Sequence, residues 1–249
     1  MTALRLGSIV LLSAALAAAD GPAAPPTGLS LDLGGNLSLQ LVQIPAGTGT
    51  VGMAKNAPSR TKEDQDARDV TIAKPFWLGT TEVTQAQYQA MMGDNPTADE
   101  ARNKQKRTQM VGPDYPVVRV SFTQAKEFCA KLAQKTGHKV RLPTDEEWEY
   151  AARAGNDGLG GRPLDEVAWH QGNSEAKQHP VGGKPANAWG LHDMLGNVGE
   201  WVTTPKKEAY IVGGDWATKP ENCRASRRAP HGSAHNDAWS GFRVLVELP

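Results

Sequence analysis

The stretch Asn187-Ala-Trp-Gly-Leu-His-Asp-Met-Leu-Gly-Asn-Val-Gly-Glu-Trp201 combines two tryptophans, three glycines and two carboxylates in one short segment. Glycine permits tight turns and tryptophan anchors loops in a core, so this segment predicts an ordered loop rather than a helix. Upstream, Thr144 and Glu147 have the spacing of a capping box, which predicts a helix over Asp145–Ala154. After Gly155 turn residues dominate. The two stretches together predict a chain with many turns and modest regular structure.

Elsewhere the sequence predicts short strands and two further capped helices. Alternating or apolar runs bounded by turn residues predict strands within Leu29–Ile44, Pro45–Met53, Phe76–Gly79, Tyr115–Val120, Val140–Pro143 and Gly241–Glu247. Capping-box pairs at Thr84/Gln87 and Ser121/Gln124 predict helices that run to Met92 and over Thr123–Thr136. Residues 56–69 are expected to form a solvated loop and residues 94–113 a surface insertion. Cys129 falls on an apolar helix face, which predicts a buried side chain that packs as a small hydrophobic residue.

The N-terminus has the pattern of a secretory signal peptide. Arg5 precedes an apolar run, and Ala17 and Ala19 stand at the small positions of a cleavage site. We therefore expect residues 1–19 to be a signal peptide, 20–40 a leader and first strand, and 41–249 one domain exported to the periplasm. No cysteine lies near the cleavage site to carry a lipid, and no later stretch is apolar for long enough to span a bilayer, so we expect a chain that is not membrane-embedded.

Charge and cysteine content exclude several classes of protein. The chain has 27 basic and 27 acidic residues, so no global field attracts nucleic acid. Its two cysteines are too few for a disulfide-stapled scaffold or for a zinc site with paired Cys-x-x-Cys spacing. The sequence also lacks the Gly-x-Ser-x-Gly, His-Glu-x-x-His, Walker and Gly-x-Gly-x-x-Gly signatures of hydrolases and nucleotide-binding proteins.

Seven motifs in order resemble the landmarks of the formylglycine-generating enzyme, or sulfatase-modifying factor, family. They are Ile44-Pro-Ala-Gly, Thr81-Glu-Val-Thr-Gln-Ala-Gln-Tyr88, Tyr115-Pro-Val-Val-Arg-Val-Ser121, Arg141–Arg153, Asn187–Trp201, Gly213-Gly-Asp-Trp216 and Gly241-Phe-Arg243. The resemblance runs from about Leu41 to Val246. It implies a single compact α+β domain with low regular secondary structure, which is formylglycine-generating-enzyme-like and related to the C-type lectin-like fold.

The resemblance also implies a calcium site. Family members bind calcium through the side chains that match Asp193 and Glu200 and the backbone carbonyls that match Gly196 and Val198. Spacing alone leaves open two solvated carboxylates beside a glycine turn, because calcium takes roughly six to eight oxygen ligands. With the resemblance we expect a structural calcium ion that closes a long loop.

The catalytic centre that the resemblance implies is incomplete here. Catalytic members hold copper(I) between two cysteines, since soft thiolates suit that ion. Counting from Gly213-Gly214, the first of these positions is Thr218 and the second is Cys223, while the active-site serine is Asp215. Two further departures are Val212 for an arginine and Gly199 for a tryptophan. A threonine is a poor copper(I) ligand, so we expect no copper and no formylglycine-forming activity.

A basic, aromatic segment near the C-terminus is the candidate contact surface. It consists of Trp216, Arg224, Arg227, Arg228 and Trp239, and arginine and tryptophan are enriched at interface anchors. A solvated basic loop is the alternative. The same arginines could lower the pKa of the Cys223 thiol, and the alternative is a buried or paired, unreactive cysteine.

Three classes of function compete. The leading hypothesis is a non-catalytic scaffold or regulatory protein that binds a periplasmic or membrane-associated protein partner. It resembles the TagR-type accessory proteins of type VI secretion, which act upstream of a membrane threonine kinase. The alternative is a periplasmic oxidoreductase of the siderophore-tailoring type, which needs a deep pocket lined by Trp216, Asp215 and Cys223 and acts on a small metabolite. A carbohydrate-binding module would need exposed polar groups around the calcium.

Overall fold

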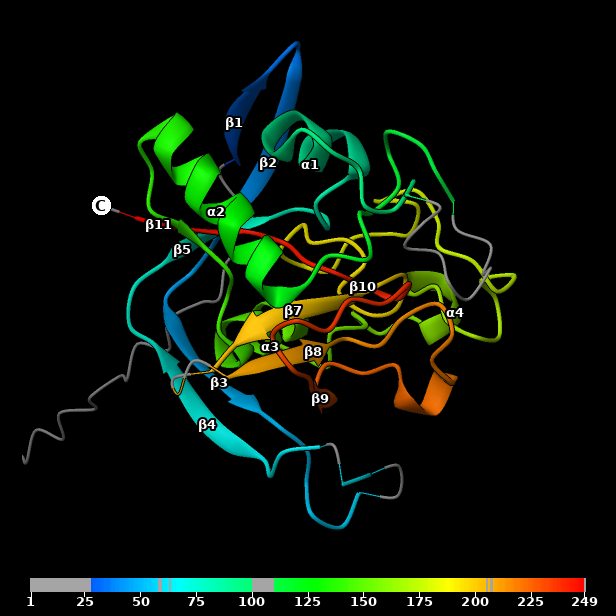
Figure 1. Cartoon of the computed structure of the whole chain (residues 1–249). Coiled ribbons are helices and arrows are strands. Elements are labelled where there is room, and N and C mark those ends of the chain that lie inside the picture. The colour runs from blue at the N-terminus through cyan, green and yellow to red at the C-terminus, as the bar shows by residue number, and fades with distance from the viewer. Residues whose placement is uncertain are drawn as a thin grey trace, which may run out of the picture.

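The largest sheet brings both ends of the described chain together (Figure 1). The computed structural model describes residues 28–248 apart from 58–59, 63, 100–109, 205 and 207. Five antiparallel strands follow the order β1-β2-β5-β11-β6. They span Gly28–Gly34 (β1), Leu37–Ile44 (β2), Phe76–Gly79 (β5), Leu245–Glu247 (β11) and Val140–Arg141 (β6). The expected first strand is thus part of the domain's own sheet.

Two smaller sheets complete the strand content. The four-stranded sheet has the order β10-β7-β8-β9, with β10 parallel to β7 and the other pairs antiparallel. Its strands span Ser240–Gly241 (β10), Gly199–Thr203 (β7), Ala209–Val212 (β8) and Arg228–Pro230 (β9). A two-stranded antiparallel ribbon pairs β3 with β4, which span Gly47–Val51 and Arg68–Ile72.

All three expected helices are present, and each begins at the expected capping box. They span Gln85–Met92 (α1), Phe122–Thr136 (α2) and Asp145–Arg153 (α3). In α3 the Thr144 hydroxyl accepts the Glu147 N–H at 3.2 Å, and the Glu147 carboxylate accepts the Thr144 N–H at 2.8 Å. One further short helix, α4, spans Leu164–Val167 in the described chain, and a single 3₁₀ turn covers Pro220–Asn222. The α+β fold with low regular secondary structure is confirmed.

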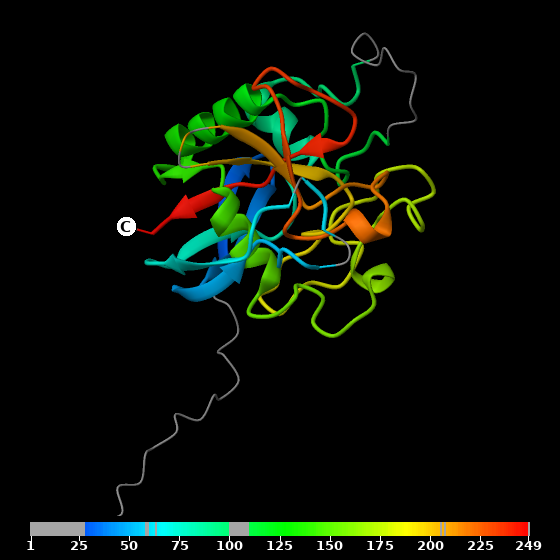
Figure 2. The ribbon, with the colours of Figure 1, turned by 90° about the horizontal axis from the view of Figure 1, so that it is seen from below.

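The helices pack on different sheets. Helices α1 and α2 contact each other and β1, whereas α3 contacts β3 and β7 (Figures 1 and 2). Around α2 the core contains Phe128 and Phe242, whose ring centroids lie 5.2 Å apart. Cys129 is 3% exposed in this core, and burial raises the pKa of its thiol to about 12. The prediction of a buried Cys129 in the apolar core is therefore confirmed.

The strand expected at Tyr115–Val120 is not formed. Arg119 adopts a left-handed backbone conformation with φ 63°, which breaks an extended run. The segment bonds instead to three different parts of the chain: Val117 N–H donates to the Val83 carbonyl, Val118 N–H to the Thr97 hydroxyl, and Arg119 N–H to the Asp237 carbonyl. The expected terminal strand over Gly241–Glu247 is also divided, between β10 and β11.

The charged segment 56–69 is not a wholly solvated loop. The side chain of Asp64 is fully buried and forms an ion pair with Arg224. Although burial opposes ionisation, hydrogen bonds from Arg224, Thr61 N–H and Ser226 hold the pKa of the Asp64 carboxyl well below its usual range. This pair ties the loop to the segment that follows the 3₁₀ turn.

The expected signal peptide at residues 1–19 and the start of the leader lie outside the described residues, as does the middle of the expected insertion at 94–113. Within the described ranges, no helix is both long enough and apolar enough to cross a membrane.

Candidate functional site

Thr218 and Cys223 lie beside each other at the position of the expected thiol pair. Both pack against Gly214, which has φ +79°. A Cβ on this glycine would lie 3.2 Å from Thr218 Cγ2 and 3.3 Å from Cys223 Cα, so only glycine allows this approach. The fold thus brings together the two positions that the motif count assigned to the thiol pair.

This pair consists of one buried thiol and one hydroxyl. Cys223 is 3% exposed, and burial, with the nearby Asp215 carboxylate, raises the pKa of its thiol to about 12. The Arg227 charge opposes this shift without reversing it. Thr218 Oγ1 accepts hydrogen bonds from Asp215 N–H at 3.0 Å and Arg227 Nη1 at 3.2 Å. Burial thus outweighs the Arg227 charge at Cys223, and the Thr218 hydroxyl is already hydrogen-bonded, which favours a buried, unreactive cysteine over one that the arginines activate.

A small cavity lies next to this pair. It has a volume of about 90 Å³ and is lined by Asp215, Arg227, His231, Asp237 and Trp239, among others. Burial raises the pKa of the Asp215 carboxyl, whose Oδ1 accepts the Ala217 N–H at 2.8 Å. A Cβ on Gly199 would lie 2.5 Å from Ile211 Cγ2, so Ile211 occupies the space beside this position. Trp216 and Cys223 do not line the cavity, which corrects the pocket expected for an oxidoreductase.

Two residues of the expected contact surface are buried. Trp216 is 7% exposed, and Arg228 is 2% exposed. Arg228 forms ion pairs with Asp145 at 3.1 Å and Glu149 at 2.7 Å. The basic segment is thus partly internal, because carboxylates distant in sequence compensate its charges. Trp239 is half-buried, with its ring centroid 6.4 Å from that of Trp216. For Arg224, Arg227 and Trp239 a partner contact stays a prediction.

The two carboxylates expected to bind calcium lie in a buried charged cluster. Glu200 is 1% exposed and bonds to Arg243 through both oxygens, at 2.6 Å each. Glu200 Oε2 also accepts the Trp148 indole N–H at 2.7 Å. Asp193 is 3% exposed, and its Oδ2 accepts the Gly182 N–H at 2.6 Å. Gly196 and Val198 follow on the same loop, where Gly196 adopts φ 76°.

Glu82 is a third member of this cluster, and the sequence analysis missed it. It is 1% exposed, and its Oε1 accepts the Asn197 amide at 3.0 Å. Burial and the Asp193 and Glu200 charges raise the pKa of the Glu82 carboxyl well above its usual range, although Arg243 opposes this. The available signal was its place in the Thr81–Tyr88 motif.

Two oxygens of the cluster have no hydrogen-bond partner among the residues that the structure describes: Glu82 Oε2 and Asp193 Oδ1. Three carboxylates face one guanidinium, so the cluster has an excess of buried negative charge. Buried unpaired oxygens are costly, and hard cations such as calcium take oxygen ligands. The two unpartnered oxygens are compatible with a cation, but the described ranges contain no group of three His, Cys, Asp or Glu side chains arranged to hold a metal ion, so the calcium site stays a prediction.

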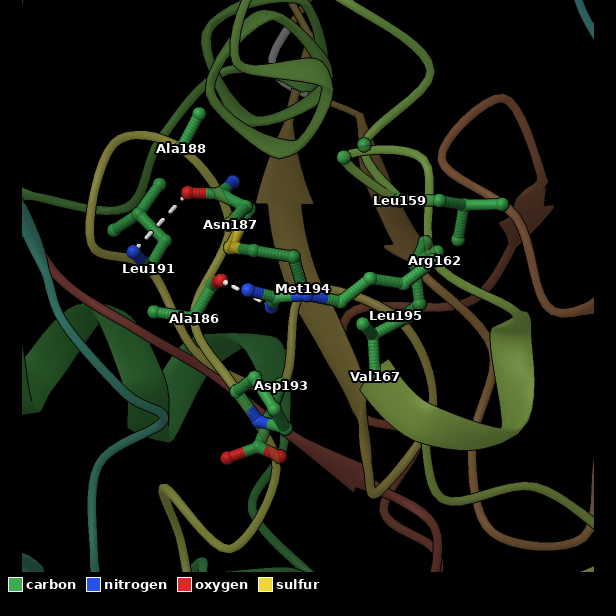
Figure 3. Close-up of a pocket in the computed structure, with 13 residues that line it drawn as sticks. Leu159, Arg162, Val167, Ala186, Asn187, Ala188, Leu191, Asp193, Met194 and Leu195 are labelled. Carbon is green, nitrogen blue, oxygen red and sulfur yellow. Dashed lines mark hydrogen bonds between the residues drawn. The ribbon is translucent and has the colours of Figure 1, made fainter.

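A separate pocket of about 180 Å³ borders Asp193 (Figure 3). Apolar side chains, including Leu159, Met194 and Leu195, form its walls, and Arg162 extends across it toward the Ala186 carbonyl at 3.4 Å. Figure 3 shows the Asp193 carboxylate pointing away from these side chains. Asp193 therefore directs its charge to the carboxylate cluster and not into the pocket.

Comparison with known proteins identifies the class. The sulfatase-modifying factor enzyme 1-like domain (FGE-sulfatase) matches residues 36–248, and the chain therefore belongs to this family. It is 28% identical to chaperone protein LppX from Paenibacillus barcinonensis, over 67% of this chain and 78% of that protein. It is 26% identical to inactive C-alpha-formylglycine-generating enzyme 2 from Bos taurus, over 74% of this chain and 76% of that protein. The structure of PvdO from Pseudomonas aeruginosa superimposes with a TM-score of 0.76 at 29% identity, covering 91% of this chain and 100% of PvdO.

Proposed function

We propose that this protein is a non-catalytic member of its family that binds a protein partner in the periplasm. In this proposal it promotes the threonine-phosphorylation signalling that regulates type VI secretion. The partner is a periplasmic or membrane-associated protein. The observation that carries the non-catalytic part is Thr218 in the place of the first thiol, beside a Cys223 thiol that burial keeps protonated.

The surrounding frame supports a scaffold role. Gly214 still holds positions 218 and 223 together, and the capping boxes and the buried Glu200–Arg243 pair are intact. With these structural contacts in place, a chain that lacks one of the two thiols still has a stable fold whose surface can bind a protein partner. One relative is named as inactive and another as a chaperone, which agrees with a non-catalytic, protein-binding role.

A structural calcium ion is part of the proposal. The Asp193 and Glu200 side chains, with the Gly196 and Val198 carbonyls, would hold it, and the Glu82 carboxyl lies in the same acidic cluster. Bound there, calcium neutralises the excess charge of the cluster and closes the loop that carries β7. Glu200 remains paired with Arg243, while Glu82 Oε2 and Asp193 Oδ1 are the two oxygens that lack another partner in the described chain.

Partner capture in the native compartment tests the proposal. A photo-crosslinking amino acid at position 239 should trap one periplasmic or membrane-associated protein, whereas the same group at the exposed Lys126 of α2 should not. Deletion of the gene should lower threonine phosphorylation of the secretion apparatus, and both wild type and Cys223→Ala should restore it. Equal crosslinking at both positions, or unchanged phosphorylation, would contradict the proposed role.

A periplasmic oxidoreductase is the second candidate. The small cavity lined by Asp215, Arg227 and Asp237 favours it, because titratable groups lie beside the thiol position, although Cys223 itself does not line the cavity. In that case Cys223→Ala should abolish oxygen consumption with the substrate, whereas the scaffold proposal requires that Cys223→Ala keeps full function.

A further inference from the structure

A third cavity lies between the β3–β4 ribbon, the C-terminal end of α3 and the loop at Trp189. Its volume is about 340 Å³, within the range of roughly 300–1,000 Å³ that is typical of small-molecule sites. Residues that line it include Gly49, Thr50, Tyr150, Arg153, Asn156 and Trp189. None of them belongs to the thiol position or to the carboxylate cluster, so this cavity needs a separate explanation.

Aromatic rings form one wall of this cavity. The centroids of Tyr150 and Trp189 lie 5.0 Å apart with the rings tilted by 54°. A Cβ on Gly47 would lie 2.8 Å from the Tyr150 hydroxyl, and one on Gly49 would lie 2.9 Å from Tyr150 Cδ2. Two glycines on one face of β3 therefore let the strand approach the ring. Trp189 is only half-buried, so part of its indole remains available to a ligand.

Hydrogen-bonding groups without a protein partner border the same space. Neither the Tyr150 hydroxyl nor the Asn156 side-chain N–H₂ bonds to another group in the described part of the chain, although Asn156 Oδ1 accepts the Gly158 N–H. Burial raises the pKa of Tyr150, so its hydroxyl stays protonated and can donate.

The cavity does not require a charged ligand. Arg153 is paired at 2.6 Å with Glu149, a fully buried carboxylate, and its Nη2 also donates to the Gly52 carbonyl at 2.7 Å. The guanidinium charge is thus compensated within the protein, which disfavours phosphates and other strong anions. The walls instead suit a neutral ligand that has one apolar face and several hydroxyl or carbonyl groups.

We infer that this cavity binds a carbohydrate, with one sugar ring against Trp189 and its hydroxyl groups bonded to Tyr150 and Asn156. A sugar ring has an apolar C–H face and a rim of hydrogen-bonding groups, which matches an aromatic wall beside unpaired donors. The inference does not depend on the proposed function, because it uses none of the residues at the thiol position. The carbohydrate module considered from sequence required calcium, whereas this site requires none.

Titration with defined trisaccharides tests the inference. Chitotriose, maltotriose, cellotriose and mannotriose are each added to the folded protein while indole N–H resonances are recorded by NMR, with Trp189 assigned from Trp189→Phe. At least one trisaccharide should shift the Trp189 resonance, and Trp189→Ala should weaken its binding at least tenfold. Asn156→Ala, an exposed loop change that leaves the core intact, should weaken binding by about three- to tenfold, the loss expected for one hydrogen bond.

Trp77→Phe on β5 is the matched control, because Trp77 is also half-buried but packs against the core around α2, which contains Phe128 and Phe242. Its saccharide affinity should equal that of the wild type. No shift of Trp189 by any of the four trisaccharides at millimolar concentration would overturn the inference. A saccharide that binds Trp189→Ala and Asn156→Ala with wild-type affinity, or a Trp189 resonance that shifts only with peptides, would also overturn it.

Discussion

Replacing Arg228 should lower the free energy of unfolding more than the removal of a surface ion pair does. Arg228 on β9 is 2% exposed and links Asp145 and Glu149 of α3, which are 3% and 0% exposed. Its Nη1 also donates to the Ser226 carbonyl at 3.0 Å. The substitution Arg228→Met keeps most of the volume but leaves two buried carboxylates without their shared cation.

The expected loss of stability in Arg228→Met depends on the partners that Glu149 and Asp145 keep. Glu149 keeps its pair with Arg153 and its bond from Gly52 N–H at 2.8 Å. Asp145 loses its cation, and its Oδ1 already lacks a partner among the described residues. Breaking a buried pair from one side costs about 3–5 kcal/mol. At roughly 2–4 °C per kcal/mol for a chain of this size, the Tm should fall by about 6–20 °C.

Urea unfolding followed by circular dichroism measures this cost. The matched control is Arg68→Met, which removes an ion pair with Glu146 at 2.8 Å whose side chains are 39% and 37% exposed. Such a surface pair contributes only about 0–1 kcal/mol. If Arg228→Met costs no more free energy of unfolding than Arg68→Met, the reasoning about the buried cluster is refuted.

Three further predictions concern the thiol, the buried acid and the calcium. Because burial raises the pKa of Cys223 to about 12, its reaction with a disulfide reagent should stay slow in the folded protein, should rise about tenfold per pH unit from pH 7 to 9 without a plateau, and should become fast in urea. The pKa of the Asp64 carboxyl is lower in the folded protein than in the unfolded chain, where it is about 4. The ionised carboxylate therefore stabilises the fold above about pH 4, and this contribution is lost as the pH falls toward the pKa of the folded state. Between pH 5 and 2 the free energy of unfolding should accordingly fall more for the wild type than for Asp64→Asn. Millimolar calcium should raise the Tm of the wild type but not of Asp193→Ala, as differential scanning fluorimetry with and without chelator would show.

Local signals in the sequence predicted the helices well. Thr84, Ser121 and Thr144 each cap a helix through a partner only three residues away, so the determinant lies within a short window. The strand predicted at Tyr115–Val120 failed for the opposite reason. Its alternating apolar residues are buried, but long-range bonds and the left-handed Arg119 determine the backbone there.

The same difference between local and long-range determinants explains which parts of the candidate site were predicted. Counting along the motif placed Thr218 and Cys223 together, because both positions depend on the short Gly213-Gly214 turn. Arg228 was assigned to a contact surface because arginine is enriched at interface anchors. Its partner Asp145 lies 83 residues away, and a pairing at that separation leaves no local pattern. Glu82 was missed likewise, since its neighbour Asn197 is 115 residues distant.

The most direct test of the non-catalytic assignment is copper(I) titration of the folded protein against a chromophoric chelator, with Thr218→Cys as the comparison. Thr218→Cys restores a thiol beside Cys223 and should take up copper(I), because two soft ligands then lie against Gly214. The account predicts no stoichiometric copper in the wild type. One equivalent of copper bound by the wild type and lost in Cys223→Ala would contradict it.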